Sequence, residues 1–167
     1  MSITYNLIGS IDQESTEQLM EYLSTHPNKI KNLILNISSI GGSVYHAVTL
    51  YNFIKNLPYP VTTHNLGEVT SAAVLVYLAG TNRTAEKVSK FVVHPIKLNL
   101  NGTYSYYQLE EMLSTINGDI ASYSNIVNLE TNSLNGFHDI NEFLRNKSIV
   151  LDYNSAAKCG FINNMCE

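Results

Sequence analysis

The 167-residue sequence is poor in charged side chains and contains no tryptophan. Only 14% of its residues are charged, against about a quarter in a typical soluble domain, and the net charge is −4. This small negative charge argues against a nucleic-acid partner, because such binding needs a basic surface. So little charge indicates a surface of neutral polar groups, or surface that is hidden in an oligomer.

Cysteine is also scarce, and both cysteines, Cys159 and Cys166, lie near the C-terminal end. Their spacing is not that of a metal site, and two cysteines cannot form a disulfide framework. We therefore expect reduced thiols without a catalytic role, and no metal or other cofactor. The sequence has no signal-peptide core and no apolar run near the ~20 residues that cross a bilayer. It predicts a cytoplasmic protein without a membrane partner.

Segments typical of strands and helices alternate along the first two thirds of the sequence. The length predicts about one domain, and 44% of the residues are hydrophobic. The predicted strands are 3–9, 31–38, 60–66 and 89–95, and the predicted helices are 12–26, 41–57 and a run that begins at Ala72. This order favours an α/β fold with right-handed crossover connections.

The last third shows a different pattern. Residues 96–106 alternate around an Asn-Gly pair, which predicts a hairpin. Apolar residues then step by three and four through 106–131, which predicts one long helix. Because such a helix is longer than a small sheet can cover, we expect an arm that packs on another subunit. The tail predicts a helix, a short strand at 149–151 and a last helix over 153–159.

Three of the predicted strand ends carry residues that catalysis uses. The second strand leads into Gly41-Gly42, the third into Thr70-Ser71, and the fourth into His94. In a parallel sheet the carboxyl ends of the strands meet at one edge, so these residues should converge. A hydroxyl, a base and free backbone N–H groups are what acyl transfer requires. Simpler explanations stay open: a hydroxyl that caps a helix, a glycine turn and a structural histidine.

The motifs and their order resemble the proteolytic subunit of the Clp protease, on the ClpP/crotonase fold. The similar segments are LIGSIDQESTEQLMEYL, NISSIGGSVYHAVTLYNFI, GEVTSAAV, FVVHP and LDYNSAAKCGFINN. The resemblance covers nearly the whole chain and implies a single domain, 1–167, with a repeated β-β-α/β-α superhelix. The head would comprise about 1–95 and 148–167, and the handle, with a projecting long helix, about 96–147.

The resemblance implies a serine peptidase that works inside an oligomeric ring. Ser71 would be the nucleophile and His94 its general base. The backbone N–H groups of Gly41, Gly42 and Ala72 would form the oxyanion hole. The family further implies hexameric or heptameric rings, stacked in pairs through the handle, and a substrate that is a peptide or an unfolded protein.

The sequence departs from the family pattern at three places. Ser148 falls where the family has the acid of its triad, and Asp139, Glu142 and Asp152 are nearby acids that are out of register. Ile40 replaces a proline before the glycine pair. The family's N-terminal helix and axial loops, which face an AAA+ unfoldase, have no counterpart in this sequence, and this argues against such a partner.

Two interpretations therefore stay open. The first is a peptidase that uses a Ser71–His94 dyad, helped or not by an irregular acid. The second is a catalytically weak or inactive ring subunit with a structural or regulatory role. A crotonase that acts on acyl-CoA fits less well, because those enzymes have a shorter glycine turn and no Ser-His pair in this order.

Overall fold

The computed structural model describes residues 1–25, 30–131 and 139–165. Its centre is a six-stranded sheet with the order β1-β2-β3-β5-β6, in which β4 pairs with β3. The strands are β1 (Ser2–Ile11), β2 (Asn32–Gly42), β3 (Val61–Thr70), β4 (Asn82–Ala85), β5 (Lys90–Val93) and β6 (Ile149–Asp152). All neighbouring pairs are parallel except β5 and β6, which are antiparallel. The predicted α/β fold is confirmed.

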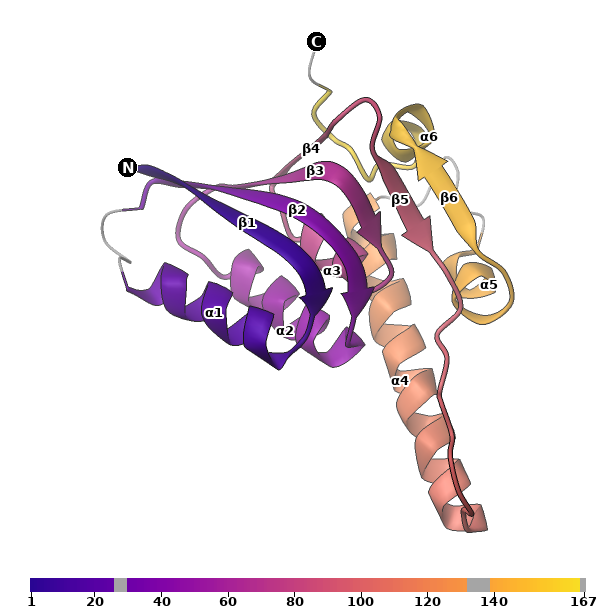
Figure 1. The fold of residues 1–167 in the computed structure, drawn as a ribbon. Helices are drawn as coiled ribbons and strands as arrows, with labels where there is room; N and C mark the ends of the chain where they lie inside the picture. The colour runs from indigo at the N-terminus through magenta and orange to yellow at the C-terminus, as the bar shows by residue number, and fades with distance from the viewer. Residues whose placement is uncertain (26–29, 132–138, 166–167) are drawn as a thin grey trace.

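Three helices connect the parallel strands and lie on one face of the sheet (Figure 1). They are α1 (Gln13–Ser24), α2 (Val44–Lys55) and α3 (Ala73–Leu78). Asp12 starts α1 with a capping box, in which its carboxylate accepts from the Ser15 N–H and the Ser15 hydroxyl accepts from the Asp12 N–H. Every side chain of α3 is buried, because this helix lies between the sheet and the neighbouring helices α2 and α4.

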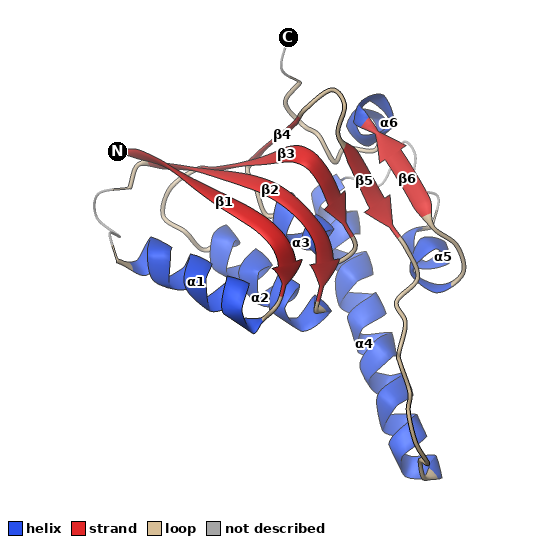
Figure 2. Cartoon of the chain, viewed as in Figure 1, coloured by secondary structure: helices blue, strands red, loops and turns tan. Residues whose placement is uncertain are grey.

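The long helix α4 (Tyr106–Thr131) has the predicted bounds. Its buried side chains all belong to its second half, and its first half projects beyond the sheet (Figure 2). Tyr106, Tyr107 and Leu113 on the projecting half are 77%, 71% and 60% exposed. Two short helices, α5 (Ile140–Arg145) and α6 (Tyr153–Lys158), flank β6.

The predicted hairpin over 96–106 is wrong. Only the turn forms: Gly102 has a φ of 116°, and the Tyr104 hydroxyl donates to the Asn101 carbonyl at 2.6 Å. The rest is irregular, and it carries the chain from the end of β5 to the start of α4 (Figure 1). Alternating polarity is not enough here, because a lone two-stranded hairpin is marginal without a third strand or a hydrophobic face to cover. Strand β4 was not predicted, because its four residues, NRTA, do not alternate between apolar and polar side chains.

Two further expectations concern the cysteines and the membrane. Cys159 is a free, partly buried cysteine, and burial raises the pKa of its thiol. Cys166 lies outside the described residues. Over the ranges that the structure describes, no helix combines the length and the apolar character needed to span a membrane.

Candidate active site

Ser71 occupies a sharp turn between β3 and α3. With a φ of 57° it is the one non-glycine residue of the described chain that has a positive φ. A left-handed backbone costs a residue with a side chain roughly 1–2 kcal/mol, and such strain persists only where neighbouring structure imposes it. Here the Ser71 N–H donates to the Val92 carbonyl at 2.8 Å, and the Ser71 carbonyl accepts from the Tyr123 hydroxyl at 2.9 Å.

Neither hydroxyl at this turn caps a helix. The N-cap of α3 is Ala72, which offers no side-chain hydrogen bond. The Thr70 hydroxyl donates instead to the Glu68 carboxylate at 2.7 Å, and this bond, with the nearby Lys90 ammonium, lowers the pKa of Glu68. Within the described residues the Ser71 hydroxyl has no hydrogen-bond partner. The helix-cap explanation of this motif is therefore wrong.

His94 follows β5 immediately. Its backbone lies near that of Ser71, because the Ser71 N–H is bonded to the carbonyl of Val92, two residues before His94. The imidazole Nδ1 is 2.9 Å from the carbonyl oxygen of Pro95. A carbonyl can only accept, so in the neutral ring this contact assigns the proton to Nδ1 and leaves Nε2 as the acceptor. His94 and the Ser71 hydroxyl are not hydrogen-bonded to each other in this structure.

Ser148 immediately precedes β6, next to the last pair of the β5–β6 ladder. The antiparallel pairing ends with Val93 opposite Ile149, and one further step in this register would place Ser148 opposite His94. A serine hydroxyl can bond to an imidazole, but it carries no charge to stabilise the protonated ring.

The three nearby acids are committed to other contacts. Asp139 caps α5 by accepting from the Asn141 N–H at 2.9 Å, and Glu142 pairs with Lys147 at 2.7 Å. Asp152 caps α6, and the hydrogen bond from the backbone of Ser155 lowers its pKa. In the part of the chain that the structure describes, no carboxylate forms a hydrogen bond or ion pair with His94.

The glycine pair at the end of β2, Gly41-Gly42, packs directly on the Ser71 turn. A Cβ built on Gly41 would lie 2.7 Å from the Ser71 Cβ and 3.1 Å from the backbone nitrogen of Ala72. The Gly41 N–H is itself occupied, because it donates to the Ser39 hydroxyl at 3.1 Å. The Ala72 N–H has no partner among the described residues, so Ala72 is a better candidate than Gly41 for a donor to an oxyanion.

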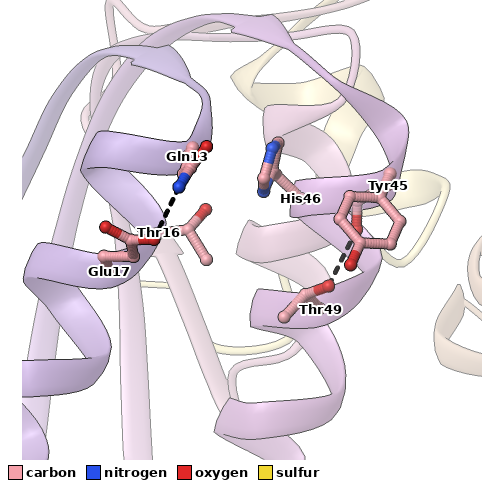
Figure 3. A pocket seen from close by; sticks show the side chains of 6 residues that line it. All are labelled: Gln13, Thr16, Glu17, Tyr45, His46 and Thr49. Carbon is pink, nitrogen blue, oxygen red and sulfur yellow. Dashed lines mark hydrogen bonds between the residues drawn. The ribbon is translucent and has the colours of Figure 1, made fainter.

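A separate pocket of about 460 Å³ lies between α1 and α2 (Figure 3). Its lining residues are Gln13, Thr16, Glu17, Tyr45, His46 and Thr49. The Thr16 hydroxyl is buried and lacks a partner in the described structure. None of the predicted site residues lines this pocket, so a search by cavity alone would pass over the Ser71 turn. The described residues also contain no cluster of three His, Cys, Asp or Glu side chains that could hold a metal ion.

Sequence reasoning missed one residue of this region, Tyr123. The apolar stripe that predicts α4 includes Tyr123 as a core position, and the side chain is indeed only 1% exposed. Its hydroxyl nevertheless reaches the Ser71 carbonyl across 52 residues of sequence. The sequence did contain one signal, the hydroxyl of a tyrosine predicted to be buried, because such a hydroxyl usually forms a hydrogen bond.

Comparisons with known proteins identify the family and the fold. The family model described as Clp protease matches residues 3–167. A point mutant of ClpP1 from Listeria monocytogenes is 22% identical, with 98% of this chain and 91% of that chain covered and a TM-score of 0.84. Another structure of ClpP1 from Listeria monocytogenes is 23% identical, with the same coverage and a TM-score of 0.74. A search of curated proteins found no significant match. The chain belongs to the Clp protease family, and its fold is that of ClpP.

Proposed function

We propose that this protein is a serine peptidase that cleaves peptide bonds, with Ser71 as the nucleophile and His94 as the general base. The conformation of Ser71 carries the proposal. Its hydroxyl is unpartnered within the described chain, and its strained backbone is bonded to the strand that leads into His94. A serine on a strained strand-to-helix turn presents its Oγ outward, as a nucleophile must be presented.

The reaction follows from the roles of these groups. The Ser71 Oγ attacks the carbonyl carbon of the scissile bond, and its proton passes to Nε2 of His94. The N–H groups of Ala72 and Gly42 donate to the oxyanion that forms. His94 then returns the proton to the departing amine, which leaves an acyl-enzyme, and water releases the acyl group by the same proton transfers. The Ser71–His94 hydrogen bond would tighten when substrate binds, as it often does in such sites.

The missing carboxylate makes this a slow enzyme in our proposal. The Pro95 carbonyl selects the tautomer of His94 that a base needs, but it offers less charge than a carboxylate. Loss of the triad acid costs about 10⁴ in rate in the well-studied serine proteases. The same observation favours the second candidate function, an inactive subunit that contributes only assembly surface.

We further propose that the chain assembles into hexameric or heptameric rings that stack through the handle, about 96–147. The support is the uncovered first half of α4, where Tyr106 and Tyr107 are largely exposed. Contiguous exposed apolar surface marks an interaction site on most soluble proteins. Leu113→Glu should shift the sedimentation coefficient toward a smaller species, and a wild-type chain that sediments as a monomer would contradict the assembly.

Hydrolysis of a mixture of fluorogenic peptides tests the proposed activity. Wild-type protein should release fluorophore slowly, and both Ser71→Ala and His94→Ala should reduce the rate to that of buffer. Ser15→Ala is the control, because it also removes a serine hydroxyl, one whose hydrogen bonds are confined to the Asp12 capping box at the start of α1. Wild-type hydrolysis no faster than that of Ser71→Ala would reject the peptidase in favour of the inactive subunit.

A further inference from the structure

Tyr123, a buried side chain of helix α4, donates one hydrogen bond to the Ser71 turn. The hydroxyl donates to the Ser71 carbonyl at 2.9 Å, and the side chain is 1% exposed. Burial raises the pKa of this phenol, so the group keeps its proton and remains a donor. The Tyr123 side chain is shielded from water, so its hydroxyl would be a buried donor without a partner if this bond were lost.

Two further hydrogen bonds involve the backbone of Ser71. One hydrogen bond to the Ser71 carbonyl comes from the Val74 N–H at 3.0 Å, within the turn itself, so it moves with the turn. The bond from the Ser71 N–H to Val92 fixes the turn to β5. The Tyr123 hydroxyl therefore holds the carbonyl of Ser71 to α4, while Val92 holds the N–H of the same residue to β5.

We propose that Tyr123 is a positioning residue that holds Ser71 at the orientation needed for attack. This inference rests on the proposed function, because it concerns the reactivity of the same serine. Without the hydroxyl, the strained turn keeps its tie to β5 and loses its tie to α4. The Oγ then samples more orientations, and misplacement of a reacting group by about 1 Å can cost up to about a hundredfold in rate.

The test is the rate at which a fluorophosphonate labels Ser71 in the full chain. Tyr123→Phe removes the hydroxyl, and Tyr77→Phe is the matched control. Tyr77 is also fully buried and donates to a backbone carbonyl, that of Thr84 at 3.0 Å. We expect Tyr123→Phe to lower the first-order labelling constant at saturating reagent by about tenfold to a hundredfold, without changing the half-saturating concentration. Tyr77→Phe should label at the wild-type constant.

Two unnatural residues at position 123 separate positioning from packing. 4-Fluorophenylalanine fills the space of the hydroxyl without donating, so it should label as slowly as Tyr123→Phe and carries the test if the phenylalanine variant does not fold. 4-Aminophenylalanine keeps an N–H donor and should restore most of the rate. A purely structural role would lower the fraction of protein that is labelled, and not the rate constant of the folded fraction.

The outcomes are distinct. Equal labelling constants for Tyr123→Phe and Tyr77→Phe, or failure of the amino variant to restore the rate, would overturn the positioning role and leave the peptidase standing. If the wild-type serine does not react at all, the peptidase is rejected and the positioning role falls with it.

Discussion

Gly41 and Ser71 lie against each other although 29 residues separate them: a Cβ on Gly41 would come within 2.7 Å of the Ser71 Cβ. The same Cβ would lie 2.6 Å from the Thr70 carbonyl oxygen. The end of β2 and the turn after β3 are therefore in direct contact, and only a residue without a side chain at position 41 permits it. This contact brings a possible oxyanion hole to the proposed nucleophile.

Gly41→Ala should abolish the reaction of Ser71 and destabilise the fold. Gly9→Ala is the control, because the φ of Gly9, 95°, is similar to the 88° of Gly41. A Cβ on Gly9 would have no atom within 4 Å, whereas a Cβ on Gly41 would collide with its neighbours. Both variants should lose roughly 1–2 kcal/mol of stability, because alanine must adopt a left-handed backbone conformation. Only Gly41→Ala adds a steric clash. Urea unfolding and fluorophosphonate labelling measure the difference. Equal behaviour of the two variants would show that the contact does not matter.

Ser71→Gly should be more stable than Ser71→Ala, by about 1 kcal/mol, although neither variant can react. Both lack the hydroxyl, so the comparison isolates the positive φ of 57° at this position. Glycine adopts this conformation freely and alanine does not. Urea denaturation of the two variants checks the prediction. An alanine variant as stable as the glycine variant would mean that the turn stores no strain.

Ser148→Asp should raise the rate of peptide hydrolysis at least about tenfold, within the ~10⁴ that a triad carboxylate contributes. The reason is the register of β5 and β6, which ends with Val93 opposite Ile149 and, extended by one residue, would place position 148 opposite His94. Asp139→Asn, Glu142→Gln and Asp152→Asn are the controls. Each should keep the wild-type rate, because these carboxylates cap helices or pair with Lys147. If one of these three variants no longer hydrolyses peptide, the acid that it lacks contacts His94 when substrate is bound.

Arg83→Leu should lower the free energy of unfolding by about 3–5 kcal/mol, because it removes a buried guanidinium and leaves the backbone carbonyls that it binds without their donor. Arg83 is 5% exposed and lies 3.7 Å from the Glu130 carboxylate. It also donates to the carbonyls of Gly80, Glu130, Gly160 and Phe161. Lys147→Leu, which breaks a solvent-exposed pair, should cost about 1 kcal/mol or less. A small loss for Arg83→Leu would mean that water replaces these bonds.

The sequence allowed the strand-end residues to be located because a parallel sheet gathers its carboxyl ends at one edge. The long helix was also predictable, since its apolar stripe depends only on local spacing. The hairpin over 96–106 failed because a strand needs a partner, and local alternation says nothing about partners. The positive φ of Ser71 and the Tyr123 contact could not be predicted either, because they too depend on partners distant in the sequence. Both arise where α4, β5 and the glycine turn pack around one short segment.

The most direct test of the account is where a fluorophosphonate attaches to the wild-type chain, determined by peptide mass spectrometry. The account predicts one adduct, on the Ser71 Oγ, with no adduct in Ser71→Ala and much slower labelling in His94→Ala. Thr70, whose hydroxyl is bonded to Glu68, should stay unmodified. An unlabelled Ser71, or equal labelling with and without His94, would contradict the claim that this pair forms an active site.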